Sequence, residues 1–175
     1  MNIDVSLIRP QVRLEDIALR GQNMPKNRLN SIKKGLLTLH TLELMAVTIY
    51  RFQITKGATE YNRHLIAAMC NEMTHFQDFQ VKLYEYGCKP SLVRWAYWIV
   101  GFSFGFFSRL MGMRTMLKTG IWVETKAVAH YAELLESVEW DDDTRRVVEK
   151  NQADEIGHIN RWNTLLISMG ENEKQ

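Results

Sequence analysis

Two short motifs in the sequence place a histidine three residues after a glutamate. Glu72 and His75 form the first pair, and Glu155 and His158 form the second. A spacing of three puts both side chains of a pair on one face of a helix, where they could bind a metal ion together. One such pair alone is typical of a solvated helix surface, so the residues around the two pairs decide their meaning.

Each pair follows another glutamate at a matched distance. Glu43 lies 29 residues before Glu72, and Glu124 lies 31 residues before Glu155. Both leading glutamates fall on apolar stripes of expected helices, so four carboxylates would meet in a core. Buried carboxylates must be paired, neutralised or bound to metal, and four glutamates with two histidines are the ligand set of di-iron and di-manganese helix bundles. The sequence therefore predicts a two-metal centre with the ligands Glu43, Glu72, His75, Glu124, Glu155 and His158.

Five neighbouring residues could support this centre. Asn71 and Asp154 each directly precede a motif glutamate, and either could hold the free ring nitrogen of a ligand histidine. Tyr50 and Tyr131 each follow a leading glutamate by seven residues. We predict supporting contacts from Asn71, Asp154, Tyr50 and His40, and a catalytic role for Tyr131 as a donor to the site or an electron gate. The alternative for both tyrosines is a place in the core.

The elements that must position these residues are helices. Prolines occur only at positions 10, 25 and 90, and no run alternates apolar and polar residues as a half-buried strand does. We expect an all-α domain in residues 26–170, a four-helix bundle with a long crossover, preceded by a polar lead over residues 1–25. The expected helices span residues 27–56, 59–86, an apolar segment from 90 onwards, 114–136, and a last helix from the acidic cap at 141–143 to 169.

Capping residues mark several of the expected helix ends. Gly57, Gly87 and Gly170 are expected to follow the ends of helices, because glycine adopts the left-handed conformation that closes a helix. Thr59 is the expected N-cap of the second helix, and the acids at 141–143 are expected to cap the last one.

The composition indicates one globular domain and excludes several classes of protein. Of 175 residues, 46% are apolar and 24% are charged, and the net charge of +2 argues against nucleic acid as the main partner. Cys70 and Cys88 form no Cys-x-x-Cys pair, which excludes a zinc ribbon or a rubredoxin site. No uncharged apolar run reaches the roughly 18 to 20 residues that a membrane span needs.

The apolar segment between the second and fourth expected helices has the composition of an interfacial helix. Residues 95–108 carry no charge, contain Gly101 and Gly105, and lie between Arg94 and Arg109. Aromatic residues with a cationic rim are typical of helices that lie on a membrane surface. We expect this helix to contact the membrane and to give a lipid-soluble substrate access through Trp95, Trp98, Phe102 and Phe106; a core helix or a dimer interface is the alternative.

Several stretches resemble one known family. Residues 39–53, LHTLELMAVTIYRFQ, are similar to the first-helix motif of the demethoxyubiquinone hydroxylase family of ferritin-like di-iron proteins. The positions that match are His40, Glu43, Ala46, Ile49, Tyr50 and Gln53. Residues 72–75, 89–112, 123–131 and 153–159 resemble the later motifs of that family in order and spacing.

The chain also departs from the family pattern. Leu39 and Leu42 replace an aspartate and a glycine of the first motif, and Ala132 replaces an asparagine. The chain continues for 17 residues after His158, where the family has a further helix. We therefore expect a divergent, C-terminally short member.

The resemblance implies an activity and a cofactor. It implies a monooxygenase that hydroxylates a polyprenylated quinone or phenol ring in ubiquinone biosynthesis, with two iron ions, or a manganese–iron pair, and O2 as co-substrate. Glu72 and Glu155 would bridge the two ions, and electrons would come from NADH or a redox protein. The resemblance further implies a peripheral protein on the cytoplasmic face of a bacterial membrane, as a homodimer or within a quinone-biosynthesis complex.

Two other functions fit the same residues. The ligand set would also serve a ferritin-like or rubrerythrin-like di-iron oxidase that removes peroxide or oxygen. A metal-free scaffold that binds quinone is the second alternative, and intact buried carboxylates count against it because they destabilise a core that does not use them.

Overall fold

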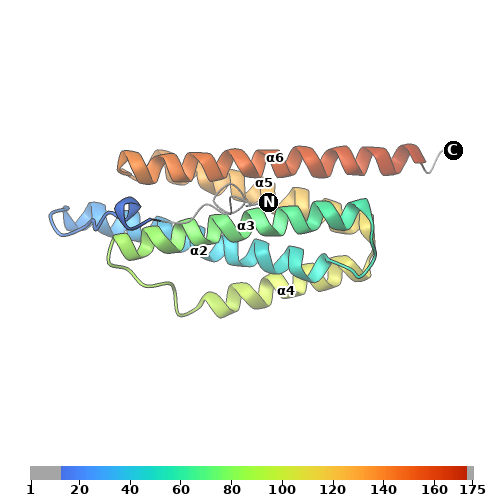
Figure 1. The fold of residues 1–175 in the computed structure, drawn as a ribbon, viewed down its shortest axis with the longest axis horizontal. Helices are drawn as coiled ribbons and strands as arrows, with labels where there is room; N and C mark the ends of the chain where they lie inside the picture. The colour runs from blue at the N-terminus through green and yellow to red at the C-terminus, as the bar shows by residue number, and fades with distance from the viewer. Residues whose placement is uncertain (1–12, 173–175) are drawn as a thin grey trace, which may run out of the picture.

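The computed structural model describes residues 13–172, which form helices and connecting loops without a strand (Figure 1). The helices are η1, a 3-10 turn at Leu14–Asp16, and α2 Lys26–Gln53, α3 Glu60–Glu85, α4 Arg94–Leu110, α5 Met113–Ser137 and α6 Asp142–Asn172. The all-α prediction is confirmed. Residues 1–12 of the expected lead lie outside the described residues, so the division at residue 25 stays a prediction.

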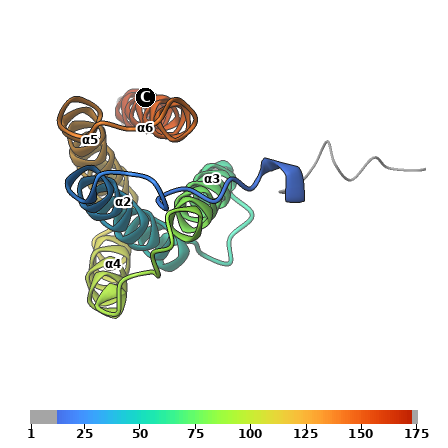
Figure 2. The same ribbon diagram turned by 90° about the vertical axis from the view of Figure 1, so that its left-hand side faces the viewer.

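Four of the long helices enclose a common interior. Seen end-on, α2, α3, α5 and α6 surround the centre of the molecule, and α4 lies on the outer side of α2 (Figure 2). The closest partnerships are α2 with α3, α2 with α4, and α5 with α6. This is the arrangement of a ferritin-like bundle in which the crossover segment α4 packs outside the four helices.

Most of the expected caps are present. The Thr59 hydroxyl accepts a hydrogen bond from the Asn62 backbone N–H at 3.2 Å, and Gly87 follows α3 with a φ of 66°. The carboxylate of Asp141 accepts from the backbone N–H of Thr144 at 3.1 Å and caps α6. These contacts fix where α3 and α6 begin and where α3 ends.

Two expected helix ends are wrong. The first helix ends at Gln53 rather than beside Gly57, because the Asn62 side chain bonds the backbone N–H and C=O of Thr55 and so closes the loop without a glycine cap. The last helix continues past Gly170 to Asn172. A glycine inside a helix costs only about 1 kcal/mol, so its presence does not force an end.

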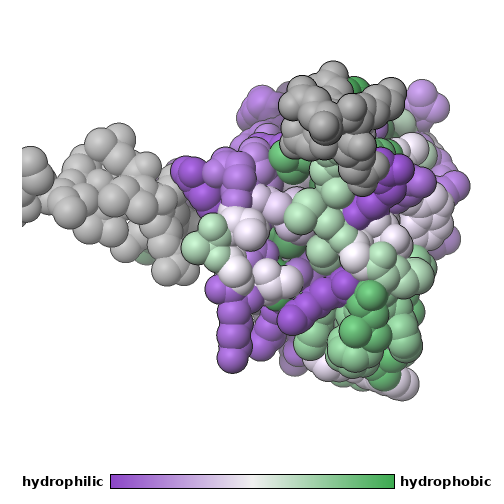
Figure 3. All heavy atoms as spheres, turned by 90° about the vertical axis from the view of Figure 1, so that its right-hand side faces the viewer, coloured by the Kyte–Doolittle hydropathy of each residue, from purple (hydrophilic) through white to green (hydrophobic). Residues whose placement is uncertain are grey.

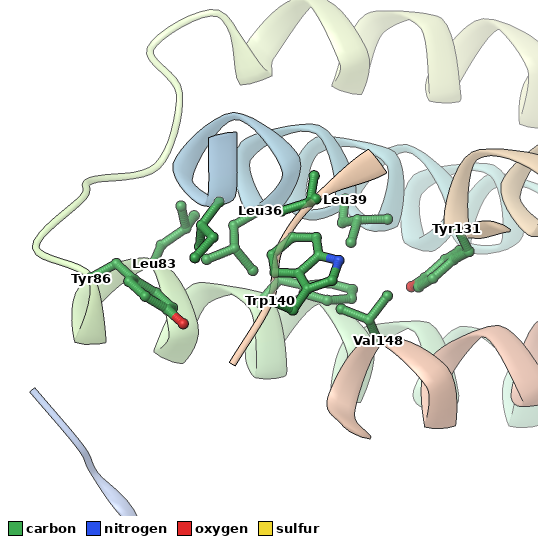
Figure 4. Packing of buried hydrophobic residues seen from close by; sticks show 10 residues of the cluster. Leu36, Leu39, Leu83, Tyr86, Tyr131, Trp140 and Val148 are labelled. Atoms are coloured by element: carbon green, nitrogen blue, oxygen red, sulfur yellow. The ribbon is translucent and has the colours of Figure 1, made fainter. Parts of the chain in front are cut away.

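Two apolar clusters fill the bundle on either side of its middle. The first contains Leu36, Leu39, Leu83, Tyr86, Tyr131, Trp140 and Val148 with three further residues, as Figure 4 shows. The second contains Tyr50, Tyr61, Leu65, Ala68, Met116, Leu117 and Trp162. On each of the four bundle helices, the glutamate of the predicted centre lies between the residues that belong to the first cluster and those that belong to the second. The glutamates of the predicted centre therefore form a polar layer between two apolar layers.

Glycines allow α4 to approach α2 closely. A Cβ atom on Gly101 would lie 2.6 Å from the backbone oxygen of Met45, and one on Gly105 would lie 2.5 Å from that of Ile49. One turn further, Gln53 of α2 donates to the buried Ser108 hydroxyl at 2.9 Å. The face of α4 that carries small residues is therefore the face that packs on the bundle.

Candidate metal centre

The six predicted ligands meet in the middle of the bundle. Each helix of the bundle contributes one glutamate, and α3 and α6 each add a histidine. All six side chains are buried, with at most 2% of any residue exposed. Their ligand atoms form two groups, each within 4.8 Å: Glu43, Glu72, His75 and Glu155, and Glu72, Glu124, Glu155 and His158.

The two histidines point the same ring nitrogen at the carboxylates. His75 Nδ1 lies 2.9 Å from Glu155 Oε1 and 3.4 Å from Glu72 Oε2. His158 Nδ1 lies 2.8 Å from Glu72 Oε1 and 3.4 Å from Glu155 Oε2. Glu72 and Glu155 thus face both histidines, and each contributes one oxygen to either side.

The other two glutamates each face one histidine only. Glu43 Oε2 lies 3.7 Å from His75 Nδ1, and Glu124 Oε1 lies 3.8 Å from His158 Nδ1. The cluster therefore has an approximate two-fold arrangement, with two shared and two terminal carboxylates.

Six atoms of this cluster are buried and make no hydrogen bond of normal geometry to any described residue, although the two histidine nitrogens lie close to the carboxylate oxygens. They are both carboxylate oxygens of Glu72 and of Glu155, and the Nδ1 atoms of His75 and His158. Buried polar atoms in folded proteins nearly always have a partner. Oxygen and imidazole donors gathered in this way fit divalent metal ions such as iron or manganese.

Burial and the neighbouring charges shift the pKa values of the glutamates and histidines in the cluster. Burial raises the pKa of Glu43 and Glu124 well above the usual carboxyl range. Burial opposes ionisation of Glu72 as well, but the adjacent rings of His158 and His75 outweigh it and lower the pKa of Glu72 to about 2. Burial would lower the pKa of His158, but the carboxylates of Glu124, Glu155 and Glu72 raise it to about 12. Four carboxylates at this site need compensating cations, and two divalent ions would supply them.

The two tyrosines bond to the terminal carboxylates crosswise. The Tyr131 hydroxyl on α5 donates to Glu43 Oε1 on α2 at 2.5 Å, and the Tyr50 hydroxyl on α2 donates to Glu124 Oε1 on α5. Each phenol therefore holds the carboxylate of the opposite helix. Both tyrosines lie in contact with the predicted ligands as well as in the core.

The remaining predicted neighbours divide into two groups. Asp154 Oδ2 lies 3.1 Å from His75 Nε2, and Asn71 donates to the same oxygen at 3.4 Å. His40 lies elsewhere, with its Nε2 3.4 Å from Gln80 Oε1 and its ring against Phe76. The structure thus brings Asp154 to a predicted ligand directly and Asn71 through Asp154.

A cavity of about 290 Å³ leads from the surface between α2 and α5 to the cluster. Its lining includes the buried carboxylates Glu43, Glu124 and Glu155 and the exposed side chains of Lys126 and His130. The walls between these ends are apolar: Leu42, Met45, Ala46, Trp122, Val123 and Ala127. The apolar walls of this cavity are suited to an uncharged ring.

The comparisons with known proteins agree with the predicted resemblance. The model of the family described as ubiquinone biosynthesis protein COQ7 matches residues 31–163. The chain belongs to the COQ7 family. The matched range contains all six predicted ligands of this COQ7-family chain.

Curated relatives of this COQ7-family chain cover most of its length. A 3-demethoxyubiquinol 3-hydroxylase from a Polaromonas species is 31% identical over 86% of this chain and 74% of the relative. The mitochondrial NADPH-dependent 3-demethoxyubiquinone 3-hydroxylase of Dictyostelium discoideum is 27% identical over 78% of this chain and 70% of the relative. A 3-demethoxyubiquinol 3-hydroxylase from Legionella pneumophila is 26% identical, with 87% and 75% covered.

The aromatic residues predicted for membrane contact lie along α4 of this COQ7-family chain. Trp98 stacks on Phe102 with ring centroids 5.8 Å apart, and Phe102 stacks on Phe106 at 5.6 Å. Trp95 is 62% exposed at the start of the helix. The lining of the apolar cavity contains none of these four, but two lining residues contact α4: Met45 packs against Gly101, and Trp122 stacks on Phe104.

Sequence reasoning missed three residues that matter in the COQ7-family site. Leu42 and Trp122 line the cavity, and Trp162 donates to Tyr50 at 3.1 Å. Trp162 lies seven residues after Glu155, as Tyr50 and Tyr131 lie seven after their glutamates. That spacing was an available signal for Trp162. For Leu42 the only signal was its replacement of a glycine of the family motif, and Trp122 had none, because their meeting depends on how α2 and α5 face each other.

Proposed function

We propose that the chain is a di-iron monooxygenase that hydroxylates the ring of a polyprenylated quinone or phenol, as in ubiquinone biosynthesis. Membership of the COQ7 family and relatives named as demethoxyubiquinone or demethoxyubiquinol hydroxylases support this reaction. The single observation that carries it for this chain is the apolar cavity that ends on Glu43, Glu124 and Glu155.

The six clustered residues are the proposed metal ligands. Glu72 and Glu155 would bridge two ions, Glu43 and His75 would complete one side, and Glu124 and His158 the other. Two iron ions, or a manganese–iron pair, would supply the binding and reduction of O2, with electrons from an external donor such as NADH or a redox protein.

The protein's own side chains have three tasks in this proposal. Tyr50 and Tyr131 hold the terminal carboxylates, and Asp154 holds the ring of His75, so that the ligands keep their orientation. The apolar walls exclude water from the end of the cavity. They also place an uncharged ring beside the carboxylates, where orientation reduces the barrier to reaction.

The proposed site of action is a membrane surface. No helix within residues 13–172 is long and apolar enough to cross a membrane. Large apolar side chains on α4 are nevertheless exposed, among them Trp95, Phe107 and Leu110. Hydrophobic residues gather at the lower right of the surface in Figure 3, and α4 lies on the lower side of the molecule in Figure 1. Such a surface supports interfacial binding, through which a polyprenyl tail would reach the cavity. The cytoplasmic face and a homodimer stay predictions.

The test is a reaction with labelled oxygen. Protein purified in detergent is loaded anaerobically with ferrous iron and mixed with a polyprenylated demethoxyubiquinol, a reductant and heavy-isotope O2. We expect a product that carries one labelled oxygen atom, and no product from Glu155→Ala.

Two results would contradict the proposal. Consumption of O2 or peroxide with unchanged quinone in every reductant tried would favour the detoxifying oxidase. Binding of the quinone by protein that takes up no iron would favour the metal-free scaffold.

A further inference from the structure

The residues seven positions after the four clustered glutamates are all aromatic and buried. They are Tyr50, Phe79, Tyr131 and Trp162, and none is more than 1% exposed. They pair across the bundle: the rings of Tyr50 and Trp162 have centroids 5.6 Å apart, and those of Tyr131 and Phe79 are 6.0 Å apart. The pairs differ chemically, because an indole is readily oxidised and a phenyl ring is not.

The Tyr50 pair is also joined by hydrogen bonds in series. Trp162 Nε1–H donates to the Tyr50 hydroxyl oxygen at 3.1 Å, and the Tyr50 hydroxyl donates to Glu124. In both hydrogen bonds the donated hydrogen points towards the carboxylate cluster: from Trp162 to Tyr50, and from Tyr50 to Glu124. Tyr131 donates to Glu43, but Phe79 behind it has no N–H or O–H to give.

The position of the indole is fixed by its surroundings. Trp162 lies in the second apolar cluster with Met116 and Leu117. Gly120 leaves the space that it occupies, since a Cβ atom there would lie 3.1 Å from both Cδ1 and Nε1 of the ring. A buried, fixed indole in contact with a phenol that is hydrogen-bonded to a proposed ligand can exchange electrons with that phenol.

We propose that Tyr50 and Trp162 form an exit route that carries oxidising equivalents from the metal centre to Trp162 when no substrate is bound. The proposal rests on the two-iron centre proposed above and adds a reaction to it. Reduction of O2 to water takes four electrons, and two ferrous ions supply two. In hydroxylation the substrate ring supplies the other two, so without a substrate they must come from elsewhere.

The hydrogen bonds give each electron and proton a path. Tyr50 gives one electron to the oxidised centre and its hydroxyl proton to Glu124. Trp162 then gives an electron to the Tyr50 phenoxyl radical and its indole proton to the same oxygen, which restores Tyr50 and leaves a neutral indole radical. In the second step Tyr50 again gives an electron to the oxidised centre and its proton to Glu124, and the indole radical then gives an electron to the Tyr50 phenoxyl. Water adds to the resulting indole cation, and the proton that the water loses passes to the Tyr50 oxygen, which leaves hydroxytryptophan and restores Tyr50. In sum O2, two ferrous ions, one tryptophan and two protons give two ferric ions, one hydroxytryptophan and one water.

The experiment exposes the anaerobically iron-loaded full-length protein to O2 with and without the demethoxyubiquinol. Peptide mass spectrometry measures hydroxylation of each tryptophan, and freeze-quench electron paramagnetic resonance detects the radical. Trp140 is the matched control, because it is buried too but donates to the backbone oxygen of Leu134, away from the cluster. We expect hydroxylation at Trp162 several-fold above Trp140, suppressed by the substrate.

Two conservative variants separate the route from general oxidation. Tyr50→Phe should lower hydroxylation of Trp162 to the level of Trp140. Trp162→Phe gives the Tyr50 pair the composition of the Tyr131 pair, and the organic radical should then reside on Tyr50. Iron content and helical circular dichroism of both variants report whether the centre still forms.

The outcomes distinguish this inference from the proposed function. Labelled quinone product with Trp162 no more oxidised than Trp140 overturns the exit route and leaves the hydroxylase. Oxidation of Trp162 that persists in Tyr50→Phe overturns the route as well. A protein that takes up no iron overturns both proposals.

Discussion

At the scale of single residues, three of the six proposed ligands have a polar contact on the side away from the cluster. Glu43 and Glu124 each accept a hydrogen bond from a tyrosine hydroxyl of the opposite helix, and Asp154 lies beside Nε2 of His75. Such partners fix the ring or carboxylate in the orientation that a metal ion needs. The contacts are unequal, because Asn71, which occupies the place of Asp154 in the other motif, donates to Asp154.

This inequality leads to a prediction for Asp154→Ala. The substitution removes the acceptor at His75 Nε2, so affinity for one of the two metal ions should fall about 10- to 100-fold. Anaerobic titration with ferrous iron or cobalt measures the change. Asp78→Ala, an acid on α3 paired with Lys150 at the surface, is the control and should leave affinity unchanged. Equal affinities in the wild type and Asp154→Ala would show that Asp154 does not support the site.

The sequence contained enough to predict which six side chains meet in the bundle but not all their neighbours. The spacing of three and the matched distances from Glu43 to Glu72 and from Glu124 to Glu155 placed carboxylates on helix faces, and in a bundle those faces meet. His40 shows the limit of this reasoning. It lies one turn from Glu43, yet its ring contacts Gln80 and Phe76, because the direction of a side chain depends on the packing of α3.

At the scale of elements, α4 depends on its two glycines for its place against α2. A methyl group on Gly105 would meet the backbone oxygen of Ile49 at 2.5 Å, and a backbone atom cannot move aside as a side chain can. Gly105→Ala should therefore lower the free energy of unfolding by about 1–3 kcal/mol, the usual cost of overpacking. Denaturant titration followed by circular dichroism measures it.

A second glycine provides the control for that prediction. A Cβ atom on Gly157 of α6 would meet nothing within 4 Å. Gly157→Ala should stabilise the protein by roughly 0.5–1 kcal/mol, because alanine loses less conformational freedom in a helix. If both variants change stability in the same direction, close packing is not what Gly105 provides.

A polar network joins the segment before α2 to the ends of α3 and α6. Arg20 bonds Glu85 at 3.1 Å, Asp141 at 2.9 Å and Asp143 at 2.6 Å, and Lys82 also bonds Asp143. The Lys82 ammonium, with Arg20 nearby, lowers the pKa of Asp143 below its usual range. The expected polar lead is thus attached to the bundle over the part that the structure describes.

This network predicts a pH dependence for Asp143→Asn. Because the folded pKa of Asp143 is lowered, its contribution to stability is present above the unfolded value of about 4 and is lost as the pH falls through the folded value. Asp143→Asn should destabilise the protein at pH 7, and the difference from wild type should shrink below about pH 4. Urea titrations at several pH values measure the difference. A difference that stays constant or grows in acid would contradict this assignment.

At the scale of the whole molecule, the exposed face of α4 is the proposed contact with the membrane. Phe107 is 58% exposed and Leu110 is 68% exposed, next to the cluster of aromatic rings on the same helix. Replacing either with serine should weaken binding to phospholipid vesicles about tenfold, because burial of such a side chain contributes about 1.5–3 kcal/mol. Co-sedimentation with vesicles measures the binding.

The control for membrane binding lies on another part of the surface. Leu14 is 87% exposed on η1, so Leu14→Ser removes as much exposed apolar area away from α4. This variant should bind vesicles as the wild type does. Equal weakening by Leu14→Ser, or no weakening by the α4 variants, would show that α4 is not the contact.

The measurement that tests the central claim most directly is the metal content of the protein after anaerobic loading with ferrous iron and removal of free metal. The two groups of buried ligands predict two iron ions per chain in the wild type. Because Glu72 and Glu155 belong to both groups, Glu72→Ala and Glu155→Ala should each lose the two-iron centre. Two iron ions retained in either variant, or no iron in the wild type, would contradict the account.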